Sequence, residues 1–195
     1  MTQAILERMN SFLILIRGIN VGGKNKLPMA ELKQCLEELG FLNVTTYIAS
    51  GNILLQSDKQ AQEIKLLIEE MLPRRFTLDS KLITVLVLSP EQLHAIIADK
   101  PKGFGEQPNL YHSDVVFLID IDPPAALAVF HPKEGVDTIW FRNGVIYSQR
   151  LSSMRTKSHL SRIVSTPAYQ SMTIRTWNTT LKLYRLLKEL RNNSL

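Results

Sequence analysis

Residues 17–26 read Arg17-Gly18-Ile19-Asn20-Val21-Gly22-Gly23-Lys24-Asn25-Lys26, a glycine-rich and basic segment between two regular elements. The apolar run Phe12–Ile16 precedes it and predicts a buried strand. Apolar residues at helical spacing follow it between Pro28 and Leu39. Glycine allows the positive φ angles at which successive backbone N–H groups converge on an anion. The segment is therefore predicted to be a turn that can hold an anionic group.

A second tight turn, Ser50-Gly51-Asn52, separates strands predicted over residues 44–49 and 53–56. A helix over residues 61–71, ended by Pro73, and a strong strand signal over residues 82–88 follow. This order, β-α-β-β-α-β, is that of the ferredoxin-like split βαβ unit. The turn after its first strand and the hairpin between its second and third strands lie at one end of the sheet. The two glycine-bearing turns are therefore expected to meet.

The second half repeats this pattern in a degenerate form. Asn143-Gly144 is a strong hairpin signal between strands predicted over residues 139–142 and 145–148. The other expected elements are a helix over 89–98, a loop over 101–109, a strand over 115–119, a helix over 124–130, a helical stretch near 152–164 and a last helix over 178–191. We predict an α+β fold of two ferredoxin-like (split βαβ) halves, residues 1–89 and 90–195, with mainly antiparallel sheets and a C-terminal helix.

Composition fits a soluble globular protein of 195 residues with 45% apolar and 21% charged residues. No apolar run approaches the length of about 20 residues that a membrane helix needs, and the first residues do not resemble a signal peptide. The single cysteine, Cys35, excludes an internal disulfide and fits a reducing compartment. We therefore expect a cytoplasmic protein that does not enter the membrane.

Positive charge gathers in the C-terminal quarter. Residues 1–149 carry 14 Lys and Arg against 17 Asp and Glu, whereas residues 150–195 carry 9 against 1. Such asymmetry favours contact with phosphate, nucleic acid or an acidic partner. The alternative is a basic tail helix that packs over the acidic body of the same molecule.

The ligand expected at the two turns is a phosphate-bearing or otherwise anionic small molecule. The candidate residues supply backbone N–H groups, positive charge or neutral hydrogen bonds. They are Arg17, Gly18, Asn20, Gly22, Gly23, Lys24, Asn25, Ser50, Gly51 and Asn52, with Arg175 and Asn178 as a further wall and Lys26 as added charge. The alternative is a turn whose glycines only fit its geometry and whose lysines are solvated.

Other functional classes find less support. Gly18 to Asn25 nearly spells a P-loop, but Pro28 delays the helix and the hairpin makes the sheet antiparallel. No pattern of metal ligands, no catalytic residue and no cofactor emerges, although Asp120 and Asp122 lie two residues apart. A nucleic-acid-binding module is weaker because the strands lack the aromatic pairs that stack bases. A protein-interaction module without ligand is the third alternative, and the oligomeric state stays open.

Four motifs resemble those of the bacterial domain-of-unknown-function 1697 family from about residue 9 onward. They are residues 17–23 (RGINVGG), 27–32 (LPMAEL), 46–52 (TYIASGN) and 177–179 (WNT). The chain departs from the family pattern at Ser158-His159-Leu160-Ser161, where a lysine is usual after the first serine, and at Thr176, where an asparagine is usual. The resemblance implies two ferredoxin-like halves, with the two turns as the family signature, and no established activity.

Overall fold

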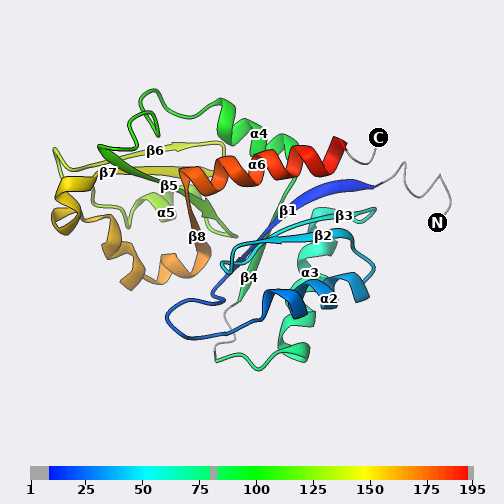
Figure 1. Ribbon diagram of the computed structural model, residues 1–195. Helices are drawn as coiled ribbons and strands as arrows, with labels where there is room; N and C mark the ends of the chain where they lie inside the picture. The colour runs from blue at the N-terminus through cyan, green and yellow to red at the C-terminus, as the bar shows by residue number, and fades with distance from the viewer. Residues whose placement is uncertain (1–8, 80–82, 193–195) are drawn as a thin grey trace. The chain divides into compact units, whose positions relative to one another are not determined.

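The protein divides into two compact units, each with its own sheet. The computed structural model describes residues 9–79 and 83–192 (Figure 1). The first unit contains the described residues up to Leu93 and from Leu183 onward, and the second unit contains residues 94–182. The division passes through α4 (Pro90–Ala98) and α6 (Trp177–Asn192). Among the described residues, no helix combines the length and apolar character needed to cross a membrane.

The first unit is a complete split βαβ fold with the strand order β2-β3-β1-β4. Every pairing in this sheet is antiparallel. Its elements are β1 (Asn10–Arg17), α2 (Met29–Glu38), β2 (Leu42–Tyr47), β3 (Asn52–Ser57), α3 (Ala61–Arg75) and β4 (Thr84–Leu88). This order is the predicted one, and it places the end of β1 beside the start of β3.

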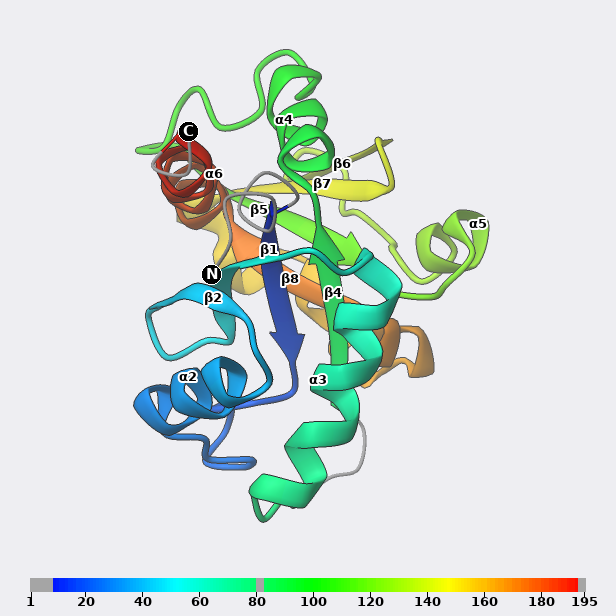
Figure 2. The same cartoon turned by 90° about the vertical axis from the view of Figure 1, so that its right-hand side faces the viewer.

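The core of the first unit lies between its sheet and its two helices, which pack side by side (Figure 2). Phe12, Ile14 and Ile16 alternate along β1 and face α2 and α3. Leu13 and Leu15, on the opposite face of the strand, are also fully buried. Each such side chain contributes about 1.5–3 kcal/mol of hydrophobic stabilisation. Burial on both faces explains why β1 is a continuous apolar run.

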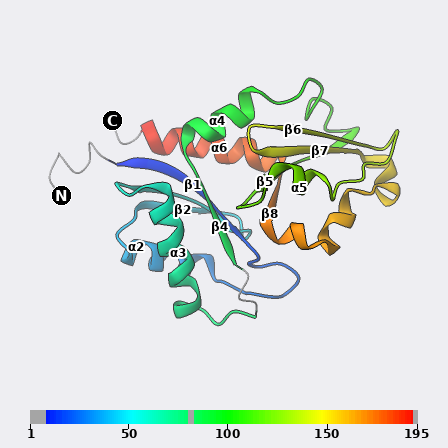
Figure 3. The same cartoon turned by 180° about the vertical axis from the view of Figure 1, so that it is seen from behind.

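The second unit repeats the connectivity with the order β6-β7-β5-β8. Three 3-10 helices stand where the first unit has α3, and α5 stands in the place of α2 (Figure 3). The elements are β5 (Tyr111–Leu118), α5 (Pro123–Leu127), β6 (Asp137–Arg142), β7 (Val145–Leu151), the 3-10 helices Ser152–Lys157, Leu160–Ser165 and Pro167–Ser171, and β8 (Met172–Thr176). The predicted fold class is therefore confirmed for both halves.

The sheet of the second unit is covered on both faces. On one face, Val116 and Ile146 pack with Phe130 and Leu160 from the region of α5 and the 3-10 helices. On the other, the hydroxyl of Tyr147 donates to the carbonyl oxygen of Ile96 in α4 at 2.6 Å. Phe104 packs edge-on against Tyr147, Trp140 and Trp177, with ring centroids 5.0–6.1 Å apart. Aromatic edge-to-face packing thus fixes the loop that contains Phe104 on this face.

Three element predictions need correction, and one falls partly outside the described residues. β8 was not predicted, the stretch near 152–164 forms 3-10 rather than one longer helix, and α3 continues past Pro73 to Arg75. Of the strand predicted over residues 82–88, Leu82 lies outside the described residues, and β4 begins at Thr84.

Candidate functional site

The turn 17–26 has an unusual backbone. Five of its residues have positive φ: Gly18 (83°), Asn20 (55°), Gly22 (60°), Gly23 (77°) and Asn25 (46°). At its tip, the N–H of Lys24 donates to the carbonyl oxygen of Val21 at 3.1 Å. Glycine and asparagine are the residues that adopt this left-handed region at least cost. The sequence pattern therefore encodes a specific loop shape.

Two asparagine side chains brace this loop from within. Asn20 accepts from the N–H of Leu27 at 2.8 Å through Oδ1 and donates to its carbonyl oxygen at 3.0 Å through Nδ2. Asn25 is 3% exposed, and its Nδ2 donates to the carbonyl oxygen of Gly18 at 2.7 Å. Its N–H donates to Oδ2 of Asp79 at 2.6 Å. Both asparagines were predicted as ligand contacts, and the structure shows that they hold the loop.

The turn 17–26 and the hairpin turn 50–52 meet, as the topology predicts. The N–H of Ile16 donates to the carbonyl oxygen of Gly51 at 2.8 Å. Gly51 has φ of +74°, and a Cβ atom added there would lie 2.6 Å from the carbonyl oxygen of Ile16 and 3.1 Å from Cδ1 of Ile19. Only glycine fits so close an approach of two backbones.

The polar side chains of the hairpin turn 50–52 form hydrogen bonds within the turn. Asn52 is fully buried, and its Nδ2 donates to the carbonyl oxygen of Tyr47 at 3.1 Å and to Oγ of Ser50 at 2.8 Å. Ile48 has φ of +50° and is 55% exposed. A β-branched residue in this region is strained, and such strain persists only where the surroundings impose it. The hairpin turn is thus held in a fixed, costly conformation beside the glycine-rich turn.

The tip of the turn 17–26 presents donors and positive charge to solvent. Gly22, Gly23, Lys24 and Lys26 are exposed, and Arg17 is partly buried at the base. Within the described part of the chain, the N–H groups of Gly22 and Gly23 donate no hydrogen bond, and neither lysine forms a salt bridge. The helix α2 begins only at Met29, after the cap residue Pro28. The arrangement is therefore a braced, basic hairpin and not a P-loop.

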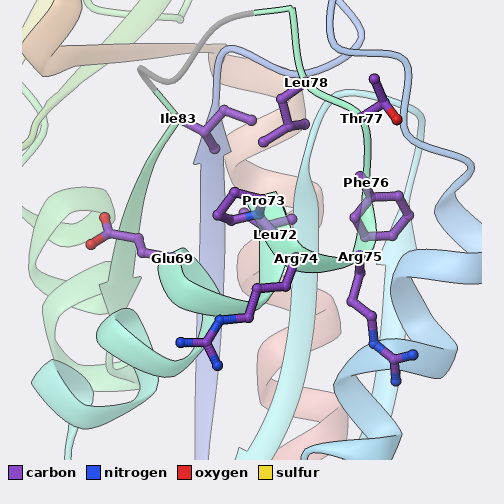
Figure 4. Close-up of a pocket in the computed structure, with 9 residues that line it drawn as sticks. All are labelled: Glu69, Leu72, Pro73, Arg74, Arg75, Phe76, Thr77, Leu78 and Ile83. Carbon is purple, nitrogen blue, oxygen red and sulfur yellow. The ribbon is translucent and has the colours of Figure 1, made fainter.

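A larger pocket of about 560 Å³ lies at the end of α3 in the same unit (Figure 4). It is near the turn 17–26, because Arg17 pairs with Thr84 at the start of β4 and Asp79 contacts Asn25. Its lining is mixed: the apolar residues are Leu72, Pro73, Phe76, Leu78 and Ile83, and the polar ones are Glu69, Arg74, Arg75 and Thr77. The two arginine side chains point away from Leu78 and Ile83 and form salt bridges with Glu70 and Glu38 (Figure 4). This pocket was not predicted, and its two arginines are already engaged by carboxylates.

Arg175 and Asn178 belong to the second unit. Arg175 lies on β8, is 8% exposed, and donates to Oγ1 of Thr173 at 2.9 Å and to the carbonyl oxygen of Ile174 at 2.8 Å. Burial lowers the pKa of Arg175 to about 10. Asn178 is exposed in the first turn of α6. Their contribution to an anion site remains a prediction.

A second, smaller hollow of about 170 Å³ lies beside Asn178, at the start of α6 and β5. His112 contributes to its wall, and Nε2 of His112 lies 3.0 Å from Oδ1 of Asp114. Asp114 is 9% exposed, and an Nη1–Oδ2 distance of 3.8 Å joins it to Arg150. Burial raises the pKa of Asp114, although His112 and Arg150 both act against the rise. The sequence analysis did not identify the pair of His112 and Asp114. The one indication in the sequence is their spacing of two residues, which places both side chains on the same face of a strand.

Metal binding finds no support in the described residues 9–79 and 83–192. No group of three or more His, Cys, Asp or Glu side chains there is arranged to hold an ion. Asp122, one of the two aspartates noted in the sequence, lies at the N-cap of α5. Trp177, within the motif at residues 177–179, is 7% exposed and packs against Phe104. The burial of Trp177 is thus explained by its packing in the fold.

Comparison with known proteins gives a family and a structural relative. The model of the family described as "Protein of unknown function (DUF1697)" matches residues 9–147. The conserved bacterial protein SP0830 from Streptococcus pneumoniae has a similar structure, with a TM-score of 0.80 and 28% sequence identity. That similarity covers 92% of this chain and 99% of SP0830. A search of curated proteins found no match.

Proposed function

We propose that this chain, which belongs to the DUF1697 family, binds a phosphate-bearing or other anionic small molecule at the turn 17–26 beside the hairpin turn 50–52. The observation that carries the proposal is the braced loop with an open tip. The side chains of Asn20 and Asn25 form hydrogen bonds within the loop, so its shape is fixed before any ligand binds. Binding then costs little ordering of the backbone.

The tip supplies groups that suit an anion. The N–H groups of Gly22 and Gly23 are exposed, and no Cβ atom stands in the way of a close approach. Lys24 and Lys26 add exposed positive charge on either side of the buried Asn25. Backbone N–H groups in a glycine-rich turn can converge on an anion, and nearby cations strengthen such a site.

We propose a smaller set of residues for direct contact with the ligand. The side chains of Asn20, Asn25 and Asn52 form hydrogen bonds within the two turns. Gly51 allows the two turns to approach closely. The remaining candidates that can face a ligand are Gly22, Gly23 and Lys24 at the tip, with Arg17 at the base and Ser50 on the neighbouring turn. We assign direct contact to this smaller set and a supporting role to the rest.

A thermal-shift panel of nucleotides, sugar phosphates and carboxylates tests the proposal. Lys24→Ala should abolish most of the stabilisation that a binding anion gives. Lys33→Ala is the matched control, because Lys33 is an exposed lysine on α2 of the same unit and lies outside the turn. Binding through general positive charge would be weakened equally by both substitutions. A panel in which no anion raises Tm would overturn the proposal.

Nucleic acid forms a separate arm of the same experiment. Neutralising phosphates makes nucleic-acid affinity fall steeply with salt. If mixed RNA binds in that manner and Lys24→Ala has no effect, the function lies with the basic C-terminal segment and the small-molecule proposal fails.

A further inference from the structure

We propose that the hollow beside His112 in the second unit is a second ligand site, which takes a small carboxylate. This site is independent of the turn 17–26. Its wall includes Tyr111, His112 and Ser113 from β5, and Trp177 and Asn178 from the start of α6. The volume of about 170 Å³ is close to that of a cavity that admits benzene, so the ligand has about six heavy atoms.

His112 is held as a hydrogen-bonding group toward the hollow. Its side chain is 41% exposed, and Nε2 is engaged by the carboxylate of Asp114, which is itself 9% exposed. A carboxylate partner on one ring nitrogen fixes the ring and leaves Nδ1 for a ligand. When the ring is protonated, Nδ1 donates a charge-assisted hydrogen bond.

The charges around His112 set the ligand's charge. Asp114 lies on the same strand, and Arg150 faces both from β7 and is directed at Asp114. Glu106, in the loop that borders the hollow, forms an ion pair with Lys100 at 2.8 Å. Among the side chains that line the hollow, His112 is the one that becomes a cation, which suits a monoanion better than a phosphate dianion.

The remaining wall is fixed by hydrogen bonds to Gln149. Oε1 of Gln149 accepts from Oγ of Ser113 at 2.9 Å and from the N–H of Gly105 at 3.1 Å. A Cβ atom at Gly105 would lie 2.4 Å from the ring of Trp177, so the loop is seated against that ring. The amide of Asn178 is exposed beside it, and the first turn of α6 contains no acidic residue. A carboxylate would thus meet His112 on one side and an amide donor on the other.

NMR titration with acetate tests the site, because acetate is a small carboxylate that stays mostly ionised at both pH 5.5 and pH 7.5. At pH 5.5 the ring signals of His112 should shift and saturate. At pH 7.5 the affinity should be about tenfold lower, because the charge-assisted hydrogen bond needs the protonated ring. Asn178→Ala, at an exposed position, should weaken acetate binding at pH 5.5 without loss of the fold.

Two controls separate this site from the other proposal and from general charge. His131→Gln, an exposed histidine of the same unit, should leave the response at His112 unchanged, as should Lys24→Ala. The inference is overturned if His112 does not respond to acetate at pH 5.5, or if His131 responds equally. It is also overturned if Asn178→Ala has no effect on the affinity.

Discussion

Replacing Gly51 with alanine tests how closely the two glycine-bearing turns approach. The new Cβ atom would lie 2.6 Å from a backbone oxygen of Ile16, and φ at this position is +74°. The left-handed conformation costs alanine about 1–2 kcal/mol. Forcing extra volume into a packed site adds about 1–3 kcal/mol. We therefore expect Gly51→Ala to lower the free energy of unfolding by about 2–5 kcal/mol.

Gly22→Ala is the matched control. Gly22 also has positive φ, at +60°, but a Cβ atom there meets nothing within 4 Å. It should cost only the conformational term of about 1–2 kcal/mol. The difference between the two variants isolates the contact of the turns. An equal loss in both would refute the close approach.

Urea denaturation followed by far-UV circular dichroism measures both variants. The protein contains two tryptophans, Trp140 and Trp177, and both lie in the second unit. Tryptophan fluorescence therefore reports on that unit, while circular dichroism reports on both. Gly51→Ala should move the transition of the first unit. A shift confined to the fluorescence signal would contradict the assignment of the contact.

Three further substitutions give distinct signatures. Tyr147→Phe removes the hydrogen bond to Ile96 and should cost about 1–2 kcal/mol near neutral pH. Burial raises the pKa of Tyr147 to about 12, so the wild type loses stability as pH rises above about 10. The difference in the free energy of unfolding between wild type and variant, measured by urea denaturation, should therefore shrink above that pH. Burial acts to raise the pKa of Asp137, but its hydrogen bonds outweigh this effect and hold the pKa below its ordinary value. The loss of stability caused by Asp137→Asn should therefore be greatest above about pH 4 and diminish in acid. Asn20→Gly keeps the positive φ but loses both hydrogen bonds to Leu27, so thermal and urea unfolding should show a loss of about 1–3 kcal/mol.

Each of these results could contradict the reasoning. A constant deficit for Tyr147→Phe from pH 8 to 12 would mean that the hydroxyl is not held protonated. A deficit for Asp137→Asn that does not change in acid would deny the role of the carboxylate's charge. Unchanged stability in Asn20→Gly would show that this side chain does not brace the loop.

The first unit could be predicted because local patterns and topology agree there. The apolar run of β1, the periodicity of α2 and the turn at Ser50–Asn52 each indicate one structure. The split βαβ order then brings the two turns together without any knowledge of tertiary contacts. In the second unit, β8 escaped prediction because Met172–Thr176 has only five residues and contains a charged arginine, although its threonines and isoleucine favour a strand. Its identity as a strand comes from its pairing with β5.

The meeting of the two turns could be predicted from the sequence, but the hydrogen-bond partners of their residues could not. Polarity marked Asn25 as a candidate ligand contact, whereas its partners are Gly18 and Asp79, the latter 54 residues away. A pattern of residue types does not reveal which polar groups are already satisfied. The pair of His112 and Asp114 was overlooked for the converse reason, since its meaning depends on the burial of Asp114 and on the neighbouring hollow.

An amide NMR titration of the 15N-labelled protein with inorganic phosphate and pyrophosphate tests the central proposal most directly. The proposal predicts saturable shifts at Gly22, Gly23 and Lys24, because their N–H groups would face the anion. Asn25, whose N–H is held by Asp79, should shift less. Saturable shifts at the tip that disappear in Lys24→Ala would support the site. Shifts spread over the basic surface, or none at Gly22 and Gly23, would contradict it.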